Sequence, residues 1–388
     1  MTRTAAPAEP RFSPLHAVHV AAGATFTDFA GWQMPVRYTS DLLEHHAVRT
    51  RAGIFDLSHM AEIVFVGPDA AAALDYALAG RLSALELGQA KYSMLLAATG
   101  GIIDDLVVYR TGDDRFLVVA NAANRAPVAA ALIERAKGFD VEVYDESDDV
   151  ALIAVQGPRA LAIVTGTPGF AIAGGHPDGE DVEAALSALK YYWSVAGFFR
   201  TEPVLIARTG YTGEDGFELF CAPDVAPVLW DALVEVGAGA GLVPCGLASR
   251  DTLRLEAGMP LYGHELSLET LPAQAGLGRV VALGKPGDFV GRAAIEASAA
   301  AGEGRPVLVG LTGEGRRAAR AGYSVVSHGL TIGEITSGAL SPTLGHPIAM
   351  AYVDPAFAEP GTVVDVDVRG TASPYTVIRL PFYQREKN

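Results

Sequence analysis

Cysteine is scarce in this chain, which contains only Cys221 and Cys245 among its 388 residues. Two cysteines give neither a disulfide framework nor a zinc-binding spacing, so we expect two small buried side chains in a reducing compartment. Basic residues are outnumbered, with 29 Lys and Arg against 45 Asp and Glu. The net charge of -16 argues against nucleic acid or an anionic membrane surface as a partner, because both are bound by clustered basic side chains.

Segments that would direct the chain to a membrane or an export pathway are also missing. No apolar run approaches the roughly 18 residues that a membrane span needs. Residues 1–13 have neither the apolar core of a secretory signal nor the Arg- and Ser-rich character of a transit peptide, which predicts a cytoplasmic protein. No His, Cys or carboxylate cluster has metal-ligand spacing, so we expect no metal site. His59 is therefore expected to be a hydrogen-bonded structural residue.

The chain is instead rich in core-forming residues, with 50% hydrophobic and 19% charged side chains. Its length predicts two or three domains. Strands that alternate with short helices and are joined by tight turns, such as Gly100-Gly101, indicate antiparallel α+β sheets rather than a doubly wound parallel sheet. A boundary follows residues 284–287. Beyond it, short β-branched segments predict a C-terminal β-barrel over 305–388, with strands at 307–312, 322–326, 348–353, 362–368 and 375–380.

The most informative stretch is Gly100–Tyr109, where two glycines precede a strand that carries Asp104 and Asp105 side by side. Neighbouring side chains of a strand point to opposite faces, so the two carboxylates face different sides. If both faces are packed, at least one carboxylate is hydrogen-bonded, shifted in pKa or facing a cavity. The alternative is a solvated edge strand with two surface acids.

Two further clusters contain candidate binding residues. A glycine-rich loop at residues 208–216 leads into a strand with the single acid Glu218, which is either a ligand contact or a surface residue. A helix that ends at Gly258 carries Arg250 and Arg254 four residues apart on one face. These arginines are either paired with nearby acids or hold an anionic ligand.

Taken together, these stretches resemble the aminomethyltransferase (T-protein) family of the glycine cleavage system. The resemblance extends over about residues 12–383 and is carried by residues 28–35, 44–50, 55–60, 100–106, 210–218, 250–258 and 335–342. It implies three domains in a cloverleaf around a central tetrahydrofolate cavity. Two interleaved α+β domains would form residues 12–285, the folate-binding region, and the barrel would be the last domain.

The resemblance also implies a reaction, its partners and its site residues. The carbon of an aminomethyl group on the lipoyl arm of H-protein would pass to tetrahydrofolate, giving 5,10-methylenetetrahydrofolate and ammonia. Asp104 would be the catalytic acid. The folate-binding residues would be Glu218, Arg250, Tyr211, Tyr92, Met60 and Asn121.

Two other functions are compatible with a folate-binding fold of this kind. A tetrahydrofolate-dependent demethylase of the same superfamily would share the fold and the folate site, and only the intact T-protein pattern argues against it. An accessory protein of iron–sulfur-cluster maintenance typically carries a Lys-Gly-Cys-Tyr loop. This chain has Arg208-Thr209-Gly210-Tyr211 at that place, without a cysteine.

Overall fold

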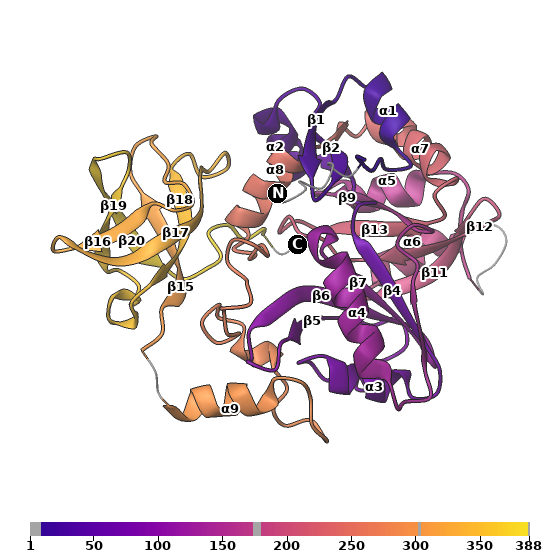
Figure 1. Cartoon of the computed structure of the whole chain (residues 1–388). Helices are drawn as coiled ribbons and strands as arrows, with labels where there is room; N and C mark the ends of the chain where they lie inside the picture. Colours follow the sequence, from indigo (N-terminus) through magenta and orange to yellow (C-terminus); the bar gives the residue numbers. More distant parts are fainter. Residues whose placement is uncertain (1–8, 174–179, 302–303, 387–388) are drawn as a thin grey trace, which may run out of the picture.

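The computed structural model describes residues 9–173, 180–301 and 304–386. The chain forms a large α+β body, built on two sheets, and a separate C-terminal barrel beside it (Figure 1). The α+β class and the C-terminal barrel predicted from the sequence are confirmed. None of the helices in the described part of the chain has the length and apolar character needed to cross a membrane.

The first sheet of the body is antiparallel, with five strands in the order β5-β6-β7-β4-β8. Its strands are β4 (Ala61–Val66), β5 (Ala90–Leu96), β6 (Ile102–Gly112), β7 (Arg115–Ala120) and β8 (Glu142–Asp145). Helices α3 (Ala70–Ala77) and α4 (Arg125–Ala136) cover one face of this sheet. Ile63 and Phe65 of β4 pack there in one core with Leu74 and Leu132.

The second sheet has seven strands in the order β10-β11-β12-β13-β9-β3-β14, and its only parallel pair among the described residues is β14 with β3. Its strands are β3 (Ala52–Asp56), β9 (Ala151–Gln156), β10 (Phe170–Ile172), β11 (Ser194–Phe199), β12 (Glu202–Ala207), β13 (Gly216–Cys221) and β14 (Leu242–Pro244). The helices that pack on its outer face are α1 (His16–Ala21), α5 (Ala160–Gly166), α6 (Glu180–Ala188) and α7 (Ala226–Ala238).

The inner faces of the two sheets share an apolar layer. Val64 and Val119 of the first sheet belong to the same core as Phe55, Leu152 and Phe220 of the second. We call this core the interlayer. Because strand side chains alternate, each inner strand sends every second residue into the interlayer and the others toward the helices.

The barrel is closed, in the order β15-β18-β17-β16-β19-β20, by pairing of β20 with β15. Its strands are β15 (Val307–Gly313), β16 (Ser324–Ser327), β17 (Leu330–Leu340), β18 (Pro347–Val353), β19 (Val363–Asp367) and β20 (Ala372–Ile378). Helix α9 (Arg292–Ala301) precedes the barrel. The strand β17 is absent from the segments predicted above, whereas the other five strands were predicted.

Two helices join the body to the barrel: α2 (Asp41–Thr50) and α8 (Leu247–Glu256). Arg49 of α2 and Glu256 of α8 form a buried ion pair of 2.9 Å. From the barrel, the Ser341 hydroxyl and the Thr343 backbone N–H both donate to Glu256. Arg49 also pairs with Glu214 of the glycine-rich loop, at 2.9 Å. One buried network therefore connects the loop, the two helices and the barrel.

The Gly100-Gly101 turn before β6 has a steric cause. Gly100 has φ +84°, a left-handed conformation that glycine adopts at little cost. A Cβ atom at Gly101 would lie 1.7 Å from the backbone oxygen of Leu268. Only glycine lets residues 266–271 pack this closely against the strand that carries Asp104 and Asp105.

Candidate active site

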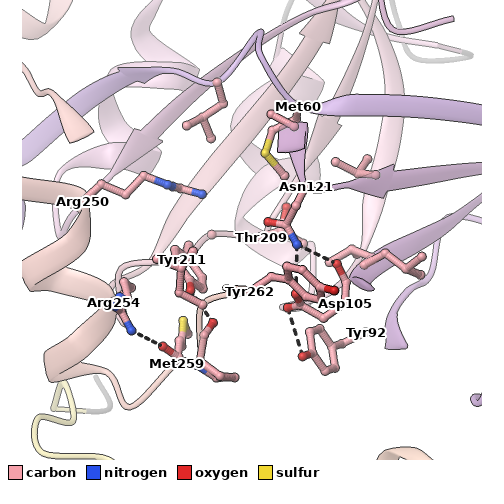
Figure 2. A pocket seen from close by; sticks show the side chains of 18 of the residues that line it. Met60, Tyr92, Asp105, Asn121, Thr209, Tyr211, Arg250, Arg254, Met259 and Tyr262 are labelled. Atoms are coloured by element: carbon pink, nitrogen blue, oxygen red, sulfur yellow. Dashed lines mark hydrogen bonds between the residues drawn. The ribbon is translucent and has the colours of Figure 1, made fainter. Parts of the chain in front are cut away.

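A cavity of about 380 Å³ opens between the two sheets, where the inner strands meet α8 and residues 258–262. We call it the central cavity. Its walls come from distant parts of the chain, and Figure 2 shows the side chains of β5, β6, the glycine-rich loop and α8 converging on it. Five tyrosines line it: Tyr92, Tyr109, Tyr192, Tyr211 and Tyr262. Such walls provide large apolar surfaces with hydroxyl groups at their edges.

The two aspartates of β6 occupy different environments. Asp105 lines the central cavity and accepts hydrogen bonds from the Tyr92 hydroxyl (3.1 Å) and from Asn121 Nδ2 (2.9 Å). Asp104 is fully buried on the other face of the strand and does not line the cavity. It accepts from Asn124 Nδ2 and from both the backbone N–H and Nδ2 of Asn121. The Asn121 amide therefore bridges the two carboxylates, and Figure 2 shows its side of Asp105.

Burial shifts both carboxyl groups toward neutral pH. It raises the pKa of Asp104 to about 7, with a further increase from the neighbouring charge of Asp105. It raises the pKa of Asp105 to about 6, although hydrogen bonds from Tyr92 and Asn121 act in the opposite direction. A carboxyl group with a pKa in this range can both take and release a proton near neutral pH.

Glu218 projects from β13 on the opposite wall. Its Oε2 atom accepts from the Thr209 hydroxyl at 2.5 Å and from the Tyr109 hydroxyl at 3.3 Å. Within the described chain no donor reaches its Oε1 atom, and the residue lines the central cavity. Glu218 is thus fixed by two hydroxyl groups and still presents an acceptor oxygen to a ligand.

The glycine-rich loop is held in place by Gln156 of β9. Its amide Nε2 donates to the backbone oxygen of Thr209, and its Oε1 accepts from the Thr212 hydroxyl. A Cβ atom at Gly210 would lie 2.0 Å from this amide, so any other residue there would have to displace the Gln156 side chain. The loop is thereby fixed with Tyr211 in the cavity wall, where its hydroxyl donates to the Pro260 backbone oxygen.

The two arginines of α8 differ in their pairing. Arg254 is buried and engaged with Asp251, Glu265 and the barrel residue Ser337. Arg250 contacts the Tyr211 ring, with its guanidinium carbon 4.8 Å from the ring centroid. Within the described ranges its guanidinium group makes no hydrogen bond or ion pair, and only its backbone N–H donates, to the Gly246 oxygen. Arg250 is therefore the arginine that is available to an anionic or hydrogen-bond-accepting ligand.

The structure brings six of the seven predicted site residues to the central cavity. They are Glu218, Arg250, Tyr211, Tyr92, Met60 and Asn121. Asp104, predicted as the catalytic acid, lies behind the wall, and the strand places Asp105 in contact with the cavity instead. The alternation of β6 puts Asp105 and Tyr109 on one face, and both residues line the central cavity.

Other cavity residues were not predicted. Tyr262 and Met259 follow α8 in a segment whose sequence gives no periodic signal, so only the tertiary fold places them. His59 also lines the cavity, and the prediction that it is hydrogen-bonded is wrong at Nδ1, which is buried without a partner. Its ring lies edge-on to Phe29, with centroids 5.4 Å apart. Burial lowers the pKa of His59 to about 4, so the imidazole is neutral at pH 7.

Comparisons with known proteins agree with this combination of sheets, cavity and barrel. Residues 15–285 match the family model of the GCVT N-terminal domain, and residues 307–384 match that of the glycine cleavage T-protein C-terminal barrel domain. The aminomethyltransferase of Streptomyces avermitilis is 58% identical over 381 residues, which cover 97% of this chain and 99% of that protein. The aminomethyltransferase of Cutibacterium acnes is 59% identical, with 97% and 99% covered.

A solved structure gives the same result. The crystal structure of the glycine cleavage system aminomethyltransferase T from Bartonella henselae superposes with a TM-score of 0.86 at 36% identity, covering 96% of this chain and 98% of that one. The chain belongs to the glycine cleavage T-protein family. Within that family it is an aminomethyltransferase, an enzyme that transfers a one-carbon unit in the glycine cleavage system.

Proposed function

We propose that the enzyme takes the carbon of an aminomethyl group carried on the lipoyl arm of H-protein and that the acceptor is tetrahydrofolate. The products are 5,10-methylenetetrahydrofolate, ammonia and dihydrolipoyl H-protein. The transferred carbon exchanges its bonds to the donor sulfur and nitrogen for bonds to two folate nitrogens. The two protons displaced from these nitrogens end on the sulfur and on ammonia, so the reaction balances.

The residues of the central cavity fit a folate. The Oε1 atom of Glu218 is an acceptor for the adjacent N–H donors of a pterin ring, and a carboxylate can accept from two of them. Tyr211, Tyr92 and Tyr262 offer ring surfaces against which a flat heterocycle packs. Arg250 provides a charge without another partner for the acidic part of the molecule. Tetrahydrofolate, when bound, supplies the two nucleophilic nitrogens.

The single observation that carries the proposed mechanism is the position of Asp105. Its carboxylate faces the central cavity opposite Glu218, with Tyr92 and Asn121 fixing its two oxygens. We assign to it the proton transfer at the folate nitrogen and the stabilisation of positive charge on the transferred carbon. Asp104 acts through Asn121, because the amide that it orients is the one that holds Asp105.

The test is a reconstituted reaction. The enzyme is mixed with aminomethyl-lipoyl H-protein and tetrahydrofolate, and methylenetetrahydrofolate and ammonia are measured separately. The proposal requires equal amounts of the two products and a rate that depends on both substrates. Release of ammonia at an unchanged rate when tetrahydrofolate is omitted would contradict the assignment of folate as the acceptor. A methylated amine replacing H-protein tests the demethylase alternative in the same assay.

A further inference from the structure

One buried acid lies outside the site described so far. Glu62 of β4 is fully buried, and neither of its carboxyl oxygens has a hydrogen-bond partner. An unpartnered buried polar group costs free energy that a protein of marginal stability retains only where the group has a use. Burial holds the pKa of Glu62 well above its usual range, which favours the carboxylic acid form, a form that can donate one hydrogen bond and accept others.

The side chain of Glu62 faces the interlayer. Ala61, Ile63 and Phe65 belong to the core under the helices, so the alternation of β4 sends Glu62 and Val64 to the opposite face. Glu62 pairs directly with Val119 of β7. Opposed side chains of an antiparallel pair lie side by side on one face. Because Val119 lines the central cavity, Glu62 lies next to a residue of that cavity wall.

A second cavity, which we call the outer cavity, is lined in part by Ser147, a residue in contact with the backbone of Glu62. It has a volume of about 280 Å³ and is lined by the N-terminal segment at Arg11 and Phe12 and by Ser58, Ser147 and Val150. The Ser147 hydroxyl accepts from the Glu62 backbone N–H at 2.9 Å. The backbone of Glu62 thus neighbours the lining of the central cavity through its pairing with Val119 and that of the outer cavity through Ser147.

The same backbone segments separate the two cavities elsewhere. Leu57 and His59 line the central cavity, whereas Ser58 between them lines the outer cavity. Likewise, Leu152 lines the central cavity and Val150 lines the outer cavity. At these two places a single segment of the chain separates the two cavities. His59 Nδ1, like the Glu62 carboxyl group, is buried without a partner.

We propose that the Glu62 carboxyl group is a binding point for the ammonia product, on a route from the central cavity through the interlayer to the outer cavity. This proposal rests on the function proposed above. Folate and the lipoyl arm must occupy the central cavity together during the transfer, and 380 Å³ is at the small end of ligand cavities. Ammonia is small, donates three hydrogen bonds and accepts one, which matches a neutral carboxyl group that lacks both kinds of partner.

The test uses the reaction in reverse, where ammonia is a substrate. Methylenetetrahydrofolate and dihydrolipoyl H-protein are kept saturating, ammonium is varied, and the formation of tetrahydrofolate is followed. Glu62→Met keeps the length of the side chain and removes both hydrogen-bonding oxygens. We expect this variant to raise the KM for ammonium about tenfold, since one buried hydrogen-bonding group is lost. The KM for methylenetetrahydrofolate should stay unchanged.

Three further variants separate a route for ammonia from a packing effect. Glu62→Gln retains a donor and an acceptor, and we expect it to preserve the KM for ammonium. Val64→Ala disturbs the same strand face without touching the carboxyl group, and it should also leave this KM unchanged. Val150→Phe narrows the outer cavity and should raise the same KM. The Val150→Phe variant tests the proposal independently if Glu62→Met does not fold.

Thermal unfolding provides a second readout. If Glu62 had only a structural role, its replacement by Met would lower the melting temperature. Removal of an unpartnered buried acid should instead raise it. An unchanged KM for ammonium in both Glu62→Met and Val150→Phe would overturn the inference, as would an equal increase in Val64→Ala. Wild-type enzyme without turnover in either direction would instead refute the proposed function.

Discussion

Comparing Asp105→Asn with Asp104→Asn distinguishes the roles of the two carboxylates that are adjacent in the sequence. Both changes keep the size of the side chain and remove its ability to carry a charge. Only Asp105 faces the central cavity. We therefore expect Asp105→Asn to reduce kcat by about 10²- to 10⁴-fold, the usual contribution of a positioned acid or base.

The effect on stability should be the reverse of the effect on turnover: Asp104→Asn should destabilise the fold more than Asp105→Asn does. Three donors converge on the Asp104 carboxylate, at distances of 3.0, 2.8 and 2.6 Å. An amide offers one oxygen and one NH2 group in their place, so at least one buried donor loses its acceptor. This costs about 1–3 kcal/mol. Asp104→Asn should thus lower the free energy of unfolding, and its kcat should fall by no more than about tenfold, because it acts on Asp105 only through Asn121.

The assay combines single-turnover rates over a range of pH with chemical denaturation of each variant. In the wild type the rate should fall as the pH drops through about 6, where Asp105 takes up a proton. Asp105→Asn should lack this dependence and retain affinity for folate. A larger loss of turnover in Asp104→Asn than in Asp105→Asn, at equal stability, would refute the reasoning and return the catalytic role to Asp104.

Three other variants test the fold and the site. Glu218→Gln should weaken tetrahydrofolate binding by about 5- to 150-fold, equivalent to 1–3 kcal/mol, and an unchanged titration curve would place the pterin elsewhere. Gly101→Ala should lower the melting temperature sharply, since its Cβ would lie 1.7 Å from a backbone oxygen, and a wild-type melting temperature would contradict this packing. Hydrogen bonds from His45 and Ser341 help to lower the pKa of Glu256 to about 2 despite its burial. Glu256 therefore stabilises the fold above pH 4.5, and this stability is lost as the pH falls toward 2. Glu256→Gln should remove that part of the acid dependence of the melting temperature.

Much of the fold could be predicted because local patterns and tertiary structure agree. The strands predicted at 307–312 and 348–353 follow their β-branched, apolar patterns, and the structure places β15 and β18 within one residue of these bounds. The strand β17 was not predicted because Gly333 and Gly338 interrupt the alternation of its apolar and polar side chains. Both glycines lie against neighbouring backbone, where a Cβ atom would come within 2.2 Å of Tyr352 and 2.5 Å of Ala319.

The candidate site could be predicted only where a motif carries it. Glu218, Arg250 and Tyr211 lie in recognisable stretches, and each lines the central cavity. The choice between Asp104 and Asp105 depends on which face of β6 is covered by helices, and a single strand does not specify this. Glu62 gave no signal at all, because an acid in an alternating strand reads as a solvent-facing residue. Its burial results from the second sheet, and most strands of that sheet lie far from Glu62 in the sequence.

The ion pair of Arg49 and Glu256 bears on how the chain can be divided. One family model ends at residue 285 and the other begins at residue 307, as if body and barrel were separate modules. A body without the barrel would keep Glu256 but lose the three donors from Ser341 and Thr343. It would also lose the Tyr383 ring, whose centroid lies 4.1 Å from the Arg49 guanidinium carbon. The body and the barrel can therefore be exchanged between relatives only if the partners of Arg49 and Glu256 are kept. On heating, we expect body and barrel to unfold in a single transition.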